Sequence, residues 1–95
     1  MLFVVSAFDR PGAGELRART RPAHLEYLKG RSEKIRAGGA FLDEGGQPVG
    51  SMLIIEAADQ TAAEAFTAGD PYGLEGVFER VEVRAWRPAL GSWVG

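Results

Sequence analysis

Apolar residues occur in short runs along the chain, and turn-forming residues separate these runs. Residues 2–8 (LFVVSAF) are apolar with a β-branched centre, which is typical of a strand covered on both faces. Loops and turns are indicated by the glycine and proline of the segments DRPGAG and GGQP. The pattern predicts four strands, at residues 2–8, 40–44, 49–56 and 77–86.

The first helix is expected between the first two strands. Pro22 has no amide hydrogen and is tolerated best near a helix start, so we place the main helix at residues 22–37, after a looser turn over 15–20. Gly38 and Gly39 are expected to end it. Its apolar stripe consists of Leu25, Leu28 and Ile35.

The second helix is expected after the third strand. Asp59 or Thr61 can cap it, and Thr61 with Glu64 has the spacing of a capping box. The helix should end near Gly69, because a residue before proline, here Asp70, is disfavoured in helical conformation.

This order of elements predicts an α+β, ferredoxin-like βαββαβ fold over residues 1–95, a single domain. Right-handed crossovers place both helices on one face of a four-stranded antiparallel sheet. The strands at 2–8 and 49–56 are apolar on both sides, so we expect a second copy to cover the other face in a homodimer. Trp86 and Trp93 either contribute to that interface or pack within one chain.

Composition excludes several classes of function. The chain has no cysteine, which excludes disulfides, thiolate catalysis and cysteine-based metal sites, and fits a cytoplasmic location. The net charge of −2 argues against nucleic-acid binding. No apolar run is long enough to span a membrane, and we expect no signal peptide and no membrane partner.

Basic residues are concentrated in the first helical region. Eight of the eleven lie between Arg10 and Arg36. They either form a solvated helix face or attract a small anionic ligand.

His24 and Asp70 are the candidates for proton chemistry. His24 is the only histidine and lies at the border of the predicted apolar stripe; an imidazole can act as acid or base near neutral pH. Asp70, in GDPYG, either shapes a turn or accepts a hydrogen bond from His24, which would fix the imidazole tautomer. Spacing alone does not decide whether they meet, although antiparallel helices would bring these ends together.

The segments RPAHLEYL and AGDPYGLEGVFERVEVRAW resemble the YCII-related family of the dimeric α/β barrel superfamily. The combination of RPAHL with DPY is the specific part of this resemblance, which extends over nearly the whole chain. It implies a ferredoxin-like protomer, a homodimer and a cleft between helices and sheet near the dimer interface.

The resemblance also implies site residues. A histidine–aspartate pair maps onto His24 and Asp70, and Ser51 and Tyr72 map to the same cleft. Arg21 either binds a substrate anion or forms a structural salt bridge. A member similar to this chain removes chloride from a chlorinated hydroxyquinol, and relatives in the superfamily include lactone isomerases and cofactor-free monooxygenases.

We therefore expect an enzyme of lyase or isomerase type that uses neither cofactor nor metal, since one histidine among scattered carboxylates is a poor metal site. His24 would be its general acid and base, and Asp70 would orient the imidazole. Arg21, Ser51 and Tyr72 would position a small hydroxylated cyclic acid or lactone. Two alternatives remain: a non-catalytic ligand-binding or regulatory dimer, and an interaction protein that uses only its dimer face.

Overall fold

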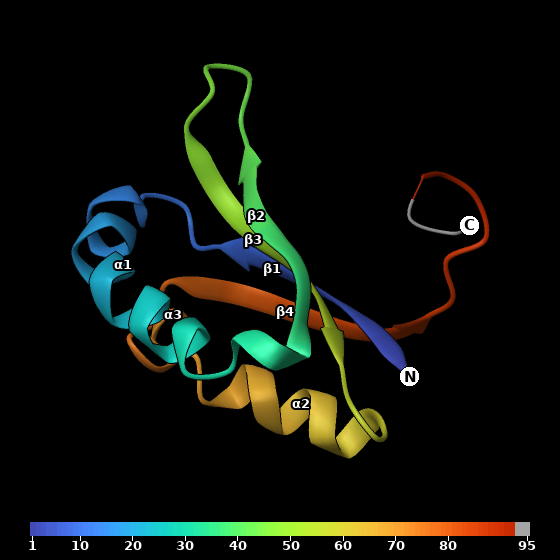
Figure 1. Ribbon diagram of the computed structural model, residues 1–95. Coiled ribbons are helices and arrows are strands. Elements are labelled where there is room, and N and C mark those ends of the chain that lie inside the picture. Colours follow the sequence, from blue (N-terminus) through green and yellow to red (C-terminus); the bar gives the residue numbers. More distant parts are fainter. Residues whose placement is uncertain (93–95) are drawn as a thin grey trace.

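The computed structural model describes residues 1–92. Its four strands are all antiparallel and lie in the order β2-β3-β1-β4. The helices lie on one face of this sheet, and the β2–β3 hairpin projects beyond it (Figure 1). The predicted ferredoxin-like fold is confirmed. The elements are β1 (Leu2–Asp9), α1 (Gly14–Lys29), the 3₁₀ turn η1 (Ser32–Lys34), β2 (Ile35–Leu42), β3 (Pro48–Glu56), α2 (Gln60–Ala68), α3 (Pro71–Leu74) and β4 (Phe78–Trp86).

The main core lies between the sheet and the helices. Along β1, Phe3, Val5 and Ala7 are buried and alternate with half-buried residues, as expected for a strand with one fully covered face. The core cluster consists of Phe3, Val5, Leu53, Ile55, Ala63 and Phe66. A smaller cluster of Ala13, Tyr72 and Val77 packs beside α1 and α3 and supports the site described below. None of the helices within residues 1–92 is long and apolar enough to cross a membrane.

The predicted position of the first helix was wrong. Helix α1 starts at Gly14 and ends at Lys29, and Pro22 lies inside it. The buried residues of α1 are Arg17, Thr20 and His24, at helical spacing. The inner face of the helix is therefore polar, and a search for an apolar stripe could not find it. Pro22 has no amide hydrogen to donate to the carbonyl of Ala18, one turn earlier in the helix. Both residues are exposed, so water can donate a hydrogen bond to this carbonyl.

The glycine pair expected to end the helix lies instead in β2, together with Ile35. A Cβ atom on Gly38 would lie 2.5 Å from Cδ2 of Leu53 on the neighbouring strand, so this position favours a residue without a side chain. Gly30 forms the C-cap of α1. Gly38 thus serves close packing within the sheet, and β2 starts five residues earlier than the predicted strand at 40–44.

The second half of the chain agrees with the pattern, except for the short helix α3, which was not predicted. Asp59 caps α2 by accepting a hydrogen bond from the amide of Ala62 at 2.9 Å, so the alternative cap at Thr61 is not used. Helix α2 ends with Gly69 as its C-cap, as predicted. Strand β4 begins one residue later than expected.

The face of the sheet opposite the helices is only partly covered. We call it the open face and define it by Val4, Phe8, Phe41, Met52 and Trp86, which the strand register places on the side away from the core residues of β1 and β3. Phe8 stacks on Phe41 with ring centroids 5.7 Å apart. Trp86 is 39% exposed. Trp93, the second tryptophan considered for an interface, lies outside the described residues.

Gly50 is a sensitive point of the fold. A Cβ atom there would lie 2.5 Å from the backbone oxygen of Ala7 on β1, and this oxygen cannot move without disturbing the sheet. We expect Gly50→Ala to destabilise the protein by about 1–3 kcal/mol through overpacking. The control is Gly39→Ala, where an added Cβ meets nothing within 4 Å. Chemical denaturation should separate the two variants, and equal stability would contradict this packing.

Candidate functional site

The site is built around a contact between His24 and Asp70. Nδ1 of His24 lies 2.8 Å from Oδ1 of Asp70, and both side chains are buried. Asp70 precedes Pro71 and is the N-cap of α3, and its Oδ1 also accepts a hydrogen bond from the amide of Tyr72 at 2.9 Å. One oxygen therefore joins the inner face of α1 to the first turn of α3. When the imidazole is neutral, this contact places its hydrogen on Nδ1 and leaves Nε2 as an acceptor.

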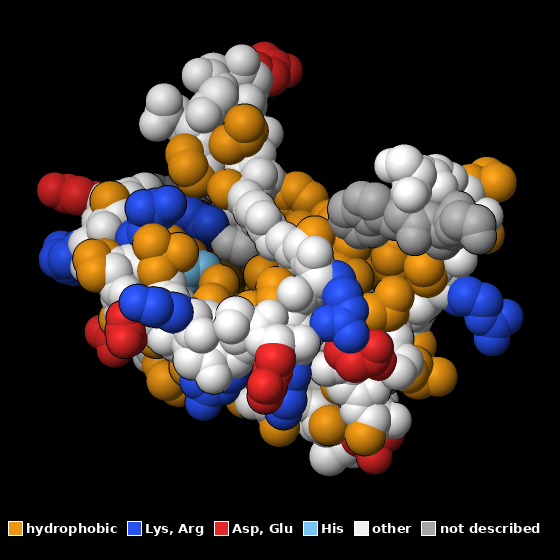
Figure 2. All heavy atoms as spheres, viewed as in Figure 1, with side chains coloured by type: hydrophobic (Ala, Val, Ile, Leu, Met, Phe, Trp, Pro, Cys, Tyr) orange, Lys and Arg blue, Asp and Glu red, His pale blue; other side chains and the backbone are white. Residues whose placement is uncertain are grey.

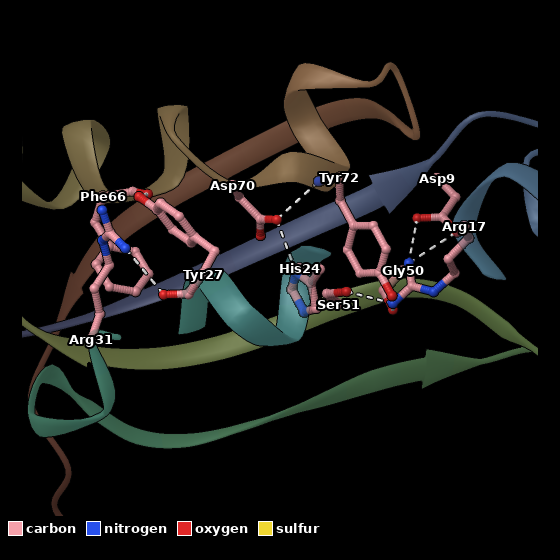
Figure 3. Close-up of polar contacts among 10 residues, drawn as sticks. All are labelled: Asp9, Arg17, His24, Tyr27, Arg31, Gly50, Ser51, Phe66, Asp70 and Tyr72. Carbon is pink, nitrogen blue, oxygen red and sulfur yellow. Dashed lines mark hydrogen bonds and ion pairs between the residues drawn. The ribbon is translucent and has the colours of Figure 1, made fainter. Parts of the chain in front are cut away.

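Tyr72 fixes the plane of the imidazole. Its ring stacks on His24 with centroids 3.9 Å apart and an angle of 17° between the planes. The guanidinium carbon of Arg17 lies 4.5 Å from the centroid of the same ring. Figure 3 shows the Tyr72 ring between His24 and Arg17. The imidazole is thus held by a hydrogen bond at one nitrogen and by an aromatic ring against its face.

Arg17 is buried and its terminal nitrogens are fully engaged. Nη1 donates to both carboxylate oxygens of Asp9, at 2.8 and 3.1 Å. Nη2 donates to the carbonyl of Gly50 at 2.9 Å and to Oγ of Ser51 at 2.5 Å. Burial raises the pKa of Asp9, and the charge of Arg17 opposes this rise. Arg17 therefore ties α1 to β1 and β3 beside the histidine.

A cavity of about 500 Å³, which we call the cleft, lies between α1 and the strands β2 and β3. None of the described residues that line it is acidic. Figure 2 shows basic side chains beside a hollow in this face of the molecule. Its polar lining comprises Arg17, Arg21, His24, Lys29, Ser32, Ser51 and Tyr72. The charge of the lining favours a ligand that carries negative charge.

Nε2 of His24 faces this cleft. Among the described residues, no buried side-chain nitrogen or oxygen lacks a hydrogen-bond partner. Nε2 makes no hydrogen bond within the described residues, so it must keep some contact with solvent, and His24 lines the cleft. The free nitrogen of the imidazole is therefore accessible to a ligand in the cleft.

Comparison with known proteins now identifies the family. The model of the YCII-related domain matches residues 1–87. The chain belongs to the YCII-related family. Protein YciI of Escherichia coli O6:H1 (strain CFT073) and that of Shigella flexneri are each 32% identical to it over 99 residues, which cover 92% of this chain and 97% of the relative.

A solved structure resembles this YCII-related chain over nearly its whole length. It is 5-chloro-2-hydroxyhydroquinone dehydrochlorinase (TftG) from Burkholderia phenoliruptrix AC1100, in complex with 2,5-dihydroxybenzoquinone. The two share 33% identity with a TM-score of 0.87, over 94% of this chain and 96% of the other. Rv0793 from Mycobacterium tuberculosis has a TM-score of 0.53 at 14% identity, over 96% of each chain, and shares the fold alone.

Four of the five predicted site residues are brought together in the structure. His24, Ser51, Asp70 and Tyr72 lie close together (Figure 3), through the contacts given above. The route to this contact differs from our expectation, since His24 lies in the middle of α1 and Asp70 between α2 and α3. Arg21 is exposed at the cleft, and within residues 1–92 it forms no ion pair. The chemical roles of these residues stay a prediction.

Arg17 was missed by the sequence analysis. It lies seven residues before His24, two helical turns away on the same face, but this segment had been placed in a loose turn. A helix start at Gly14 would have revealed the shared face. Within the described part of the chain, no group of three or more histidine, cysteine or acidic side chains is arranged to hold a metal ion.

The contact with Asp70 can be tested through the tautomer of His24. At an alkaline pH that leaves the imidazole neutral, we expect the hydrogen on Nδ1, whereas an imidazole without a partner favours Nε2. Two-bond ¹H–¹⁵N correlation spectra report the tautomer directly. Asp70→Ala should shift the population toward hydrogen on Nε2.

The matched control is Asp59→Ala, which removes another aspartate N-cap without touching the site. Asp59→Ala should cost about 1 kcal/mol through loss of an exposed cap. Asp70→Ala should cost more, because it also leaves the buried Nδ1 of His24 without a partner. Only Asp70→Ala should alter the tautomer. A spectrum of the native protein with hydrogen on Nε2 would contradict the geometry.

Proposed function

We propose that this chain is a cofactor-independent enzyme of lyase type that acts on a small hydroxylated cyclic compound carrying negative charge. The observation that carries this proposal is the His24–Asp70 pair, buried at Nδ1 but open to the cleft at Nε2. Support also comes from the related dehydrochlorinase TftG, whose name gives a chlorinated hydroxyquinol as its substrate.

The geometry suits proton transfer at a ring hydroxyl. Nε2 of His24 would accept a proton from the hydroxyl of a bound hydroxyquinol, while Asp70 holds the opposite nitrogen and stabilises the imidazolium. The imidazolium would return this proton to the chlorine-bearing ring carbon. Loss of a second hydroxyl proton then expels chloride. Two O–H bonds and one C–Cl bond break and one C–H bond forms, so the products are a hydroxyquinone and HCl, and no oxidant is required.

The exposed, positively charged side chains of α1 would attract this substrate. Arg21 and Lys29 are eight residues apart and both line the cleft, with His24 between them. Because Arg21 forms no ion pair among the described residues, its guanidinium is available to an anionic oxygen. We assign it to substrate binding on this basis.

Substitution of the histidine tests the proposed reaction. With 5-chloro-2-hydroxyhydroquinone as substrate, we expect His24→Gln to lower kcat by about 10²–10⁴-fold, because the proton acceptor is lost. Chloride release measured with an ion-selective electrode gives the rate. Undiminished release by the variant would refute the role of His24, and a native protein that binds quinones without any turnover would favour a binding module.

Occupancy of the cleft can be blocked without altering the histidine. Ala40 lines the cleft from β2, and Ala40→Trp should fill the space and lower affinity for 2,5-dihydroxybenzoquinone at least tenfold. The control is Ala65→Trp, on the exposed side of α2 and outside the cleft. Isothermal titration calorimetry measures the affinity of each variant, and equal affinities would show that the ligand binds outside the cleft.

We also infer that a second copy of the chain covers the open face. Its apolar residues are only partly buried by their own chain, although Ile54 on the same side of the sheet is 3% exposed, and a partly exposed apolar sheet face is typical of an interface. We expect Met52→Glu, on the open face, to raise the fraction of monomer in sedimentation velocity experiments. Leu74→Glu, on α3, replaces an exposed apolar residue on the helical layer and should leave assembly unchanged. A native protein that sediments as a monomer would contradict this inference.

A further inference from the structure

The hydroxyl of Ser51 is oriented by Arg17. Nη2 of Arg17 donates to Oγ of Ser51 at 2.5 Å, so the serine oxygen is already an acceptor in this contact. The hydroxyl hydrogen of Ser51 has no acceptor within the described residues, and Ser51 lines the cleft. Ser51 is therefore set to donate its hydrogen to a ligand, and the contact with a charged donor strengthens that donation.

The hydroxyl of Tyr72 is a second donor in the cleft. It makes no hydrogen bond within the described residues, and because no buried polar atom there lacks a partner, it must keep contact with solvent. Burial raises the pKa of Tyr72, and the charge of Arg17 opposes this rise. The hydroxyl therefore keeps its hydrogen at neutral pH. Figure 3 shows the ring pointing from α3 toward the strand that carries Ser51.

Arg17 itself is a poor anion ligand. Its charge is balanced by Asp9, and both of its terminal nitrogens already donate to protein oxygens. It acts as a positioning residue that holds Ser51 from one side and supports the Tyr72 ring from another. Positive charge available to a ligand must therefore come from the other basic residues of the lining, Arg21 and Lys29. The uncharged hydroxyls of Ser51 and Tyr72 can donate hydrogen bonds to a ligand oxygen.

We propose that the hydroxyls of Ser51 and Tyr72 form an oxyanion subsite of the cleft, which binds the ring oxygen that gains negative charge when Nε2 of His24 removes a proton. This inference rests on the proposed function and narrows its substrate class to enolisable cyclic compounds with at least two ring oxygens, such as hydroxyquinols. The histidine and the donor pair then contact different oxygens of one ring. Donors fixed before the reaction stabilise developing charge without reorganisation.

Removal of each hydroxyl tests the subsite. Tyr72→Phe keeps the ring that stacks on His24 and Arg17 and loses only the hydroxyl. Ser51→Ala removes the second donor. For chloride release from 5-chloro-2-hydroxyhydroquinone, we expect each variant to lower kcat by about 10²-fold while KM changes less than fivefold, because the contact strengthens only as charge develops.

Matched controls separate this effect from a structural one. Tyr27→Phe removes a hydroxyl that donates to the carbonyl of Phe66 at 2.6 Å, outside the cleft, and Ser6→Ala removes one on the side of β1 away from Leu53 and Ile55. Both should retain the kcat of the native protein. The proposal is overturned if Tyr72→Phe and Ser51→Ala behave like these controls.

A binding experiment distinguishes failure of the subsite from failure of the proposed reaction. The probe is 2,5-dihydroxybenzoquinone, titrated by calorimetry into the native protein and the double variant Ser51→Ala/Tyr72→Phe. We expect the Kd to rise at least tenfold in the double variant, because this acidic probe is an anion at neutral pH and its ring oxygens carry charge without proton transfer to His24. If the native protein releases no chloride but shows this difference, the enzymatic proposal fails and the subsite stands. If the native protein does not bind the probe, or both bind equally, the subsite is refuted.

Discussion

The site depends on a single carboxylate oxygen. Oδ1 of Asp70 accepts hydrogen bonds from the imidazole of His24 and from the amide of Tyr72. The first bond reaches α1 and the second starts α3, so the oxygen sets the distance between these helices as well as the tautomer of the imidazole. Tyr72 therefore orients the imidazole in two ways: its amide holds the carboxylate of Asp70, and its ring stacks on His24. Structural capping and the orientation of His24 are two consequences of the same contact.

The polar inner face of α1 explains how a small protein can build such a site. Burial of arginine, threonine and histidine is costly unless each polar group is paired. Here the partners come from the sheet and from α3, since Asp9 and Ser51 meet Arg17 and Asp70 meets His24. Within residues 1–92 no buried side-chain polar atom is left without a partner. The cleft beside this face can therefore be polar without leaving the helix unstable.

Prediction from sequence succeeded where burial is apolar and failed where it is polar. Strands β1, β3 and β4 and helix α2 follow from apolar runs, turn residues and the Asp59 cap, all of which are local signals. The start of β2 was misplaced together with the end of α1. Helix α1 could not be placed, because its buried stripe is polar and Pro22 lies inside it, and Arg17 was missed for the same reason. The 46 residues that separate His24 from Asp70 give no local signal of their contact. Their pairing was expected from the family resemblance, with support from the antiparallel arrangement of two helices, and in the structure it depends on how α3 packs on α1.

The central claim is that Nε2 of His24 contacts the hydroxylated ligand while Nδ1 stays bound to Asp70. The most direct measurement is the ¹⁵N chemical shift of both imidazole nitrogens during titration with 2,5-dihydroxybenzoquinone. The account predicts a large change at Nε2 that saturates with the ligand, and a hydrogen that remains on Nδ1. Both shifts remaining unchanged at saturating ligand would contradict it.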